Sequence, residues 1–254
     1  MKKGNCSVSR SQTCERRVNE VSEPSSQGIS NAQAALAAVS AQGNWADTKK
    51  DFPKQRLLII ITGGPGTGKS GVATGFLSFL ERDDIVRLSY DDVKEKEFDR
   101  FGFDNETQKD RLNRFSLEEF YLMLGKAMWE GRTILTEYPF YQRHKPRLQE
   151  LIDEYSYDAA TIFLYTDIHT VYQRFINRND GDRHPGHLLS RYHIEDFSPE
   201  TLIHEKQVPD FEEFAGGIAH KEYDVGLGIS IPVDVSDFSK ISYEEIYQRI
   251  IDYY

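Results

Sequence analysis

Cysteine is scarce in this sequence. Cys6 and Cys14 are the only two, and both lie near the N-terminus. Two cysteines outside a folded core do not make a disulfide framework, so a reducing compartment is expected. Met1–Lys3 is basic, as the start of a secretory signal would be, but the stretch that follows is polar. These features predict a cytoplasmic protein.

Long apolar runs and an excess of positive charge are also missing. No stretch approaches the roughly 20 apolar residues that span a bilayer, so no membrane anchor is expected. The 254 residues hold 31 Lys and Arg against 41 Asp and Glu, a formal net charge of −10. Such a surface repels polyanions, which disfavours long nucleic acid as a partner. A small nucleotide remains a possible ligand of this acidic protein, because the N–H groups and lysine of a binding loop can make the local electrostatic potential positive.

The first 52 residues differ in composition from the rest. They are rich in Ser, Gln, Asn and Ala and poor in large apolar side chains. A segment of this kind buries too little apolar surface to fold alone. Residues 1–52 are therefore predicted to be a flexible N-terminal extension without chemistry of its own, and docking of a protein partner is one open role for it. Residues 53–254 are enough for one α/β domain with its own core.

From residue 56 onward, apolar strand patterns alternate with helical patterns. This alternation predicts an α/β fold, a three-layer α/β/α sandwich around a five-stranded, mainly parallel sheet. The five expected strands are Leu57–Thr62, Ile85–Tyr90, Thr133–Tyr138, Ala159–Tyr165 and Ile231–Val235.

Two of the intervening helices carry end signals. Ser116 and Glu119 have the spacing of a capping box, and Gly131 stands where the same helix would end. Ser242 and Glu245 repeat the box before the last helix. The pattern therefore predicts one helix that begins at Ser116 and another that begins at Ser242.

A glycine-rich loop follows the first expected strand. Residues 63–70 read Gly-Gly-Pro-Gly-Thr-Gly-Lys-Ser, which fits the phosphate-loop pattern G-x-x-x-x-G-K-[ST], and an amphipathic stretch follows. Glycine backbone can turn successive N–H groups toward an anion, and a helix N-terminus adds its dipole. The alternative is a glycine-rich turn with a chance lysine, which the strand–loop–helix context disfavours. The predicted nucleotide-binding residues are Gly63, Gly64, Pro65, Gly66, Thr67, Gly68, Lys69, Ser70 and Gly71.

Within this loop, two side chains have expected roles in binding ATP and Mg²⁺. Lys69 would reach the β- and γ-phosphates. Ser70 would offer its hydroxyl to Mg²⁺ held by the nucleotide.

Acidic residues stand at the ends of the second and third strands, where ligands of such a sheet lie. Asp91 could accept the proton of an attacking hydroxyl as a general base. In the alternative interpretation, Asp91 or Asp92 only caps the following helix. Glu137 could order a water on Mg²⁺ or hold the acceptor; otherwise it is an ordinary polar strand end.

A basic segment around residues 174–190 is predicted to form a mobile lid. Arg178 and Arg183 flank a turn rich in Pro and Gly and could meet the charge that develops during phosphoryl transfer. Arg174 alone is expected to belong to a solvated basic helix face. His184 could donate a hydrogen bond within the loop or to phosphate, whereas zinc binding with His187 is disfavoured because too few further ligands lie nearby.

These motifs together resemble a known family. The phosphate loop, Ser89–Glu95 with its Asp91, Glu137 after the third strand and the Arg-His-Pro-Gly-His run at 183–187 are similar to bacterial P-loop kinases, often labelled AAA-family ATPases. Their relatives include zeta toxins, polynucleotide 5′-kinases and chloramphenicol phosphotransferases. The resemblance covers about residues 56–254. It implies that Lys69 and Ser70 bind phosphate and magnesium, that Asp91 is the general base, and that Arg178 and Arg183 belong to the lid.

The function expected from these observations is an ATP-dependent phosphotransferase, a kinase that acts on a hydroxyl of a small molecule. A nucleoside or nucleotide, a sugar nucleotide and an antibiotic all remain open as acceptors. The alternative is a nucleotide-dependent switch or a regulatory ATPase without a small-molecule acceptor. Thr136-Glu137 at the third strand end, in place of Asp-Glu, disfavours the mechanical ATPases. Residues 195–228 show no pattern that indicates a role.

Overall fold

Five strands lie side by side in one parallel sheet, in the order β2-β3-β1-β4-β5. The computed structural model describes residues 50–52, 56–179 and 183–254; the predictions for residues 1–49 lie outside them. The strands are β1 (Leu57–Gly63), β2 (Val86–Ser89), β3 (Ile134–Glu137), β4 (Asp158–Tyr165) and β5 (Ile229–Asp234). All five expected strands are therefore present, with ends that differ by at most two residues.

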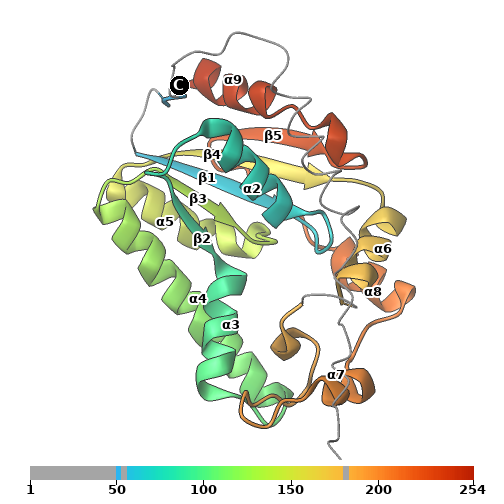
Figure 1. Cartoon of the computed structure of the whole chain (residues 1–254). Helices are drawn as coiled ribbons and strands as arrows, with labels where there is room; N and C mark the ends of the chain where they lie inside the picture. The colour runs from blue at the N-terminus through green and yellow to red at the C-terminus, as the bar shows by residue number, and fades with distance from the viewer. Residues whose placement is uncertain (1–49, 53–55, 180–182) are drawn as a thin grey trace, which may run out of the picture. The chain divides into compact units, whose positions relative to one another are not determined.

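Helices cover both faces of this sheet (Figure 1). The α-helices are α2 (Lys69–Leu80), α3 (Tyr90–Phe101), α4 (Glu106–Trp129), α5 (Lys145–Tyr155), α6 (Ile168–Asn179), α7 (Pro199–Glu205), α8 (Phe211–Ala219) and α9 (Tyr243–Tyr253). Three short 3-10 turns are η1 (Gln142–His144), η2 (Pro185–His187) and η3 (Phe238–Lys240). Among the described residues, no helix is long and apolar enough to cross a membrane.

The central strand β1 explains the three layers. Every residue of β1 is buried, as expected for a strand covered on both faces. Because side chains alternate along a strand, Leu58 and Ile60 pack with α3, α4 and α5 on one face. Leu57, Ile59 and Ile61 pack with α2 and α9 on the other face. The predicted α/β/α sandwich with a parallel sheet is confirmed.

A third apolar cluster lies away from the sheet. Phe98 and Phe103 pack against Leu189 and Tyr192, and Phe103 and Tyr192 exchange backbone hydrogen bonds of 2.7 and 2.8 Å as an isolated antiparallel bridge. This cluster attaches the segment after α6 to the far end of α3.

The predicted helix start at Ser116 is wrong. Helix α4 begins ten residues earlier, at Glu106, and Asn105 caps it by accepting a hydrogen bond from the backbone of Gln108. Ser116 lies buried inside the helix, and its hydroxyl donates to the carbonyl of Leu112 at 2.8 Å. A serine can satisfy its hydroxyl in this way within a helix, so the capping-box spacing alone does not mark a start.

The other end signals are confirmed. Ser242 caps α9 by accepting from the backbone of Glu245 at 3.1 Å. Gly131, with φ of 72°, follows the end of α4. Tyr90, expected at the end of the second strand, instead opens α3, because Ser89 caps that helix.

Candidate active site

The phosphate loop turns tightly between β1 and α2. Gly66 and Gly68 have φ of +85° and +84°, a region that side chains rarely adopt. A Cβ on Gly66 would stand 2.5 Å from the carbonyl oxygen of Val171 on α6. Helix α2 begins at Lys69, and the N–H groups of its first turn lack intrahelical acceptors. The loop thus presents backbone donors and a helix N-terminus at one place, which suits an anion.

Lys69 folds back over this loop. Its Nζ donates to the carbonyl oxygens of Gly63 at 3.1 Å and Gly64 at 2.9 Å. Burial lowers the pKa of the Lys69 ammonium to about 8, and the positive charges of Arg178 and Arg183 act in the same direction.

Two acidic residues oppose that effect on Lys69. Asp91 and Glu137 both raise its pKa through their charges. The pKa of Lys69 therefore responds to the charges of Asp91, Glu137, Arg178 and Arg183, which come from four different segments of the chain. The structure brings together the charged residues that the sequence singled out as catalytic.

Asp91 lies in the first turn of α3, at the carboxyl end of β2. The expected cap is neither Asp91 nor Asp92: the Ser89 hydroxyl accepts the hydrogen bond from the backbone of Asp92 at 3.3 Å. Capping therefore leaves the Asp91 carboxylate free for another role. Its Oδ1 lies 3.1 Å from the Nζ of Lys94, and its side chain is 29% exposed.

The Asp91 carboxylate is held in its ionised form. Burial pushes its pKa upward, but the charges of Lys94, His187 and Lys69 outweigh burial and hold the pKa well below its usual range. An anion that stays ionised can accept a hydrogen bond from a neutral hydroxyl at any ordinary pH.

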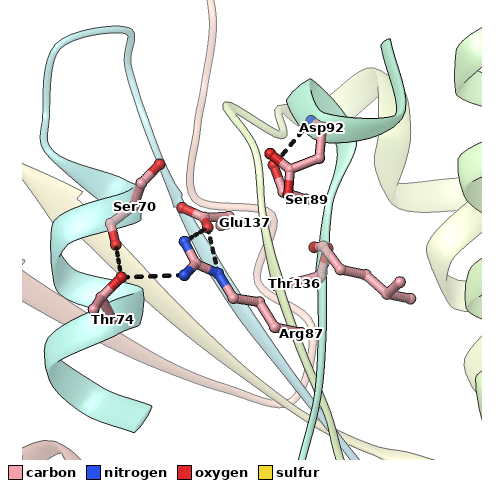
Figure 2. A network of polar contacts seen from close by, with 8 residues as sticks. Ser70, Thr74, Arg87, Ser89, Asp92, Thr136 and Glu137 are labelled. Carbon is pink, nitrogen blue, oxygen red and sulfur yellow. Dashed lines mark hydrogen bonds and ion pairs between the residues drawn. The ribbon is translucent and has the colours of Figure 1, made fainter. Parts of the chain in front are cut away.

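Glu137 is the last residue of β3 and forms an ion pair with Arg87 of β2 (Figure 2). The Nε of Arg87 lies 2.9 Å from Glu137 Oε1, and Nη1 donates to the hydroxyl of Thr74 at 3.1 Å. The Thr74 hydroxyl in turn donates to the Ser70 carbonyl oxygen at 2.8 Å. Arg87 therefore connects the acid at the end of β3 to the first turn of α2.

The second oxygen of Glu137 is compatible with a divalent cation. Oε2 is buried and has no hydrogen-bond partner among the described residues, and Ser70 is exposed at the start of α2. Mg²⁺ prefers oxygen ligands and usually keeps waters and substrate phosphates in its shell. In the described part of the chain, no group of three His, Cys, Asp or Glu side chains could hold a metal alone. A magnesium ion here would depend on nucleotide phosphates.

Arg183 lies just after the gap in the described residues. Its guanidinium stands 5.6 Å from the centre of the Phe175 ring, and its Nε is buried without a partner in the described chain. Burial and the charge of Arg178 lower its pKa, while Asp91 raises it. Lys69, Arg178 and Arg183 influence one another through their charges, and such a concentration of positive charge would favour an anion.

Arg174 is partly buried and bonded to the backbone instead of lying on a solvated face. Its guanidinium donates to the carbonyl oxygens of Val235 at 2.7 Å and Ser236 at 3.0 Å. It also lies 4.3 Å above the ring of Phe238. Phe238 contacts the phosphate loop, because a Cβ on Gly68 would stand 2.4 Å from its Cζ.

Histidines of the lid segment bond to carboxylates near α3. The Nε2 of His184 lies 3.0 Å from Asp99, and the Nε2 of His187 lies 2.8 Å from Glu95. The Nδ1 of His184 accepts from the backbone of Gly186 at 3.1 Å. Both rings are thus engaged within the protein. Inside its loop His184 accepts a hydrogen bond, whereas the sequence predicted that it would donate one.

Several residues at the site carry no motif in the sequence. Tyr223 lies against the phosphate loop, 3.7 Å from where a Cβ of Gly64 would stand. Tyr90 and Tyr138 contact edge to face with ring centres 4.4 Å apart. Burial is the main cause that raises the pKa of both hydroxyls, and the charge of the nearby Asp91 raises it further. Only the tertiary fold brings these aromatic rings next to the charged cluster.

Comparisons with known proteins agree with this geometry. A family model described as Zeta toxin matches residues 42–200, more than half of the chain. Among solved structures, a protein of Chloroflexus aurantiacus J-10-fl described as a "putative kinase" is 23% identical; the match covers 79% of this chain and 100% of that chain with a TM-score of 0.57. This similarity supports the same fold.

Two further solved structures are more distant. A gluconokinase from Sinorhizobium meliloti 1021 is 14% identical over 78% of this chain and 91% of that chain, with a TM-score of 0.44. A chain of the PezAT chromosomal toxin–antitoxin system of Streptococcus pneumoniae is 15% identical over 63% of this chain and 65% of that chain, with a TM-score of 0.38.

Proposed function

The chain belongs to the zeta toxin family, and from this premise we propose that it transfers the γ-phosphate of ATP to a hydroxyl group of a small molecule. The observation that carries the proposal is the convergence of Lys69, Asp91, Glu137, Arg178 and Arg183 on one place. Phosphoryl transfer needs positioning and charge stabilisation more than covalent chemistry from the protein. A cationic loop beside a carboxylate supplies both.

The phosphate loop would bind the polyphosphate of ATP. Its backbone N–H groups and the N-terminus of α2 would hold the β-phosphate, and Lys69 would exchange its bonds to Gly63 and Gly64 for phosphate oxygens. When bound, Mg²⁺ would supply charge neutralisation between the β- and γ-phosphates. Ser70 and the unpartnered oxygen of Glu137 are the residues that would hold it, the latter through water.

The nucleobase would lie near Phe238. Its ring is 44% exposed and contacts the loop at Gly68, with the guanidinium of Arg174 above it. Flat aromatic and guanidinium groups suit base stacking, which tolerates different bases.

Asp91 would act as the general base. The hydroxyl oxygen of the acceptor forms the new bond to the γ-phosphorus while the bond from that phosphorus to the bridging oxygen breaks, and ADP leaves. The hydroxyl proton passes to Asp91. A base held ionised by Lys94 and Lys69 removes that proton late, after the new bond has largely formed, which fits a loose transition state.

Arg178 and Arg183 would stabilise the transferring group. Negative charge spreads over the equatorial oxygens of that group in the transition state. Two guanidinium groups whose charges already act on Lys69 could meet this charge as it develops.

The experiment that tests the proposal is a screen for labelled product. Full-length protein with Mg²⁺ and γ-labelled ATP is incubated with fractions of a small-molecule extract, beside Lys69→Ala and Asp91→Asn variants. Wild type should label a small-molecule product. Lys69→Ala should lose both ATP binding and turnover, whereas Asp91→Asn should keep ATP affinity and transfer about 10²- to 10⁴-fold more slowly.

Two outcomes would contradict this assignment. Asp91→Asn with full activity toward the labelled acceptor would remove the general base. Release of inorganic phosphate alone, at a rate that no fraction changes and Asp91→Asn does not alter, would instead favour a regulatory ATPase. A comparison of ATP and GTP affinities would show whether the protein prefers guanine nucleotides, as GTPase switch proteins do.

A further inference from the structure

The outer face of α4 carries three large apolar side chains that the described part of the chain leaves exposed. Phe115 is 43% exposed, Leu122 is 64% exposed and Trp129 is 75% exposed. Phe101 of α3, 50% exposed, touches Phe115 edge to face with ring centres 6.1 Å apart and extends the patch. Figure 1 shows α4 along one flank of the helical layer.

Spacing places these side chains on one stripe. Phe115, Leu122 and Trp129 are seven residues apart, which is almost two turns of helix at each step. The core-facing residues Phe120 and Leu124 lie on the opposite side of α4 and are fully buried. Helix α4 is therefore apolar on two opposite faces, and only one face has a partner in the described chain.

Charged residues border this stripe in a symmetric order around Leu122. Glu118 lies four residues before it and Lys126 four residues after it; Arg114 lies eight before and Glu130 eight after. All four are exposed. No ion pair among the described residues uses any of them, although Glu118 contributes to raising the pKa of Arg147 on α5.

We propose that the chain forms a two-fold symmetric dimer in which α4 packs antiparallel against α4 of a second copy, with the axis at Leu122. A two-fold axis places each residue opposite its mate at the same distance from the axis. In this register Glu118 and Lys126 of the copy, each about 40° from the centre of the stripe, lie at the same level across the seam. Arg114 and Glu130 lie about 80° from the centre on opposite sides and stay outside the contact. Phe115 faces Trp129 of the copy.

The charges select this arrangement over a parallel one. A parallel pair would set Glu118 against Glu118 and Lys126 against Lys126, which is unfavourable. The antiparallel register sets Glu118 against Lys126 of the copy on both sides of the axis and also buries the two aromatic residues. Leu122 lies at the centre of this interface, and the pairing of Trp129 with Phe115 of the copy buries a large aromatic residue of the kind that often carries binding energy. A single helix pair is small for an interface, so the dimer is weak and depends on concentration.

Sedimentation velocity of the full-length protein over a range of concentrations tests the dimer. Wild type should shift from monomer to dimer as concentration rises. Leu122→Arg should stay monomeric at every concentration, while circular dichroism and ATP affinity remain those of wild type. A wild type that stays monomeric, or a dimer that Leu122→Arg leaves intact, would overturn the proposal.

Charge reversal tests the register itself. Glu118→Lys alone sets Lys against Lys, and Lys126→Glu alone sets Glu against Glu, so each variant should dimerise at least about tenfold more weakly than wild type. Mixing the two variants restores opposite charges at both contacts, and the mixture should form a heterodimer. Failure of the mixture to associate better than either variant would exclude the antiparallel register.

A cysteine on the axis gives a second measurement. In a Cys6→Ser, Cys14→Ser background, Leu122→Cys should form a disulfide-linked dimer on mild oxidation because residue 122 faces its own copy. Phe115→Cys in the same background should not, since residue 115 faces 129. Equal cross-linking at both positions would count against the proposal.

Discussion

The guanidinium of Arg87 forms an ion pair with the carboxylate of Glu137 across neighbouring strands, and the Glu137 side chain is only 3% exposed. Removing one partner of a buried pair leaves an uncompensated charge, which costs more than the pair contributes. Arg87→Met keeps the apolar stem and removes the charge. We expect it to lower the free energy of unfolding by about 3 kcal/mol, near the low end for buried pairs because Arg87 is 35% exposed.

Urea denaturation measures this loss, and Arg82→Met is a matched control. Arg82 also pairs with a carboxylate, at 2.6 Å to Asp84, but that carboxylate is 59% exposed. Exposed pairs contribute at most about 1 kcal/mol. Equal losses of unfolding free energy in Arg87→Met and Arg82→Met would show that the buried Glu137 carboxylate does not depend on Arg87 for its stabilisation.

Two glycines of the predicted phosphate loop differ in what they tolerate. Gly66 has φ of +85°, and a Cβ there would meet the Val171 carbonyl oxygen at 2.5 Å, whereas a Cβ on Gly71 would have no atom within 4 Å. Gly66→Ala should distort the loop and weaken ATP binding at least about tenfold. Gly71→Ala lies inside α2 and should raise the free energy of unfolding by about 0.5–1 kcal/mol with ATP affinity retained.

Calorimetric titration with ATP and thermal denaturation check both variants. If Gly66→Ala binds ATP with wild-type affinity, α6 must shift to make room for the added methyl group. A loss of affinity in Gly71→Ala would mean that the first turn of α2 needs more freedom than its open surroundings indicate.

Binding of ATP should be linked to a proton on Lys69. Burial lowers its pKa to about 8 in the free protein, and nearby phosphate oxygens would raise it. The bound form then holds the proton more tightly than the free form. Affinity is therefore complete below about pH 8 and falls as pH rises through the higher pKa of the complex.

Calorimetry at pH 8.5 in two buffers of different ionisation enthalpy measures this proton. The apparent binding enthalpies should differ in the direction of proton uptake. Lys69→Met, which has no titrating group, serves as the control and should show a smaller difference in whatever binding remains. Identical enthalpies for wild type in both buffers would contradict the linkage.

The sequence predicted the parts of the fold that local pattern controls. The apolar run of β1 and the cap at Ser242 each depend on neighbours within a few residues, and both were correct. The start of α4 was wrong because its first half, Glu106–Arg114, is polar. A helical segment that buries few side chains shows no apolar residues at helical spacing. Only the cap at Asn105 could therefore have identified the start of α4.

The site was predictable only in part, for a related reason. The glycine loop and the acids at strand ends follow from chain order in a parallel sheet. Arg87 is 50 residues from Glu137, and Glu95 is 92 residues from His187. No local pattern fixes such pairs, because they depend on which strand neighbours β3 and on where the lid segment packs.

The contact between His187 and Glu95 should make the stability of the protein depend on pH. The His187 side chain is 4% exposed, with Nε2 2.8 Å from Glu95. Burial lowers its pKa to about 4, with Lys94 and Arg183 acting in the same direction, while Glu95 and Asp91 oppose them.

The sign of this effect follows from proton uptake. The unfolded chain binds a proton on His187 near pH 6.5, and the folded chain does so only near pH 4. Between these values the unfolded state holds more protons, so stability falls as pH falls. From pH 7 to pH 5 the loss attributable to His187 is roughly 2 kcal/mol. His187→Gln can still donate to Glu95 but cannot titrate, so it should lose about that much less than wild type.

Urea denaturation at pH 7 and pH 5 compares the two proteins, and His193→Gln is the control. His193 also bonds to a carboxylate, at 2.9 Å to Asp104, but it is 33% exposed and His187 remains in place. The control should therefore keep the full loss of wild type. If His187→Gln loses as much stability as wild type over this range, the buried imidazole is already protonated in the folded protein, and its bond to Glu95 is an ion pair.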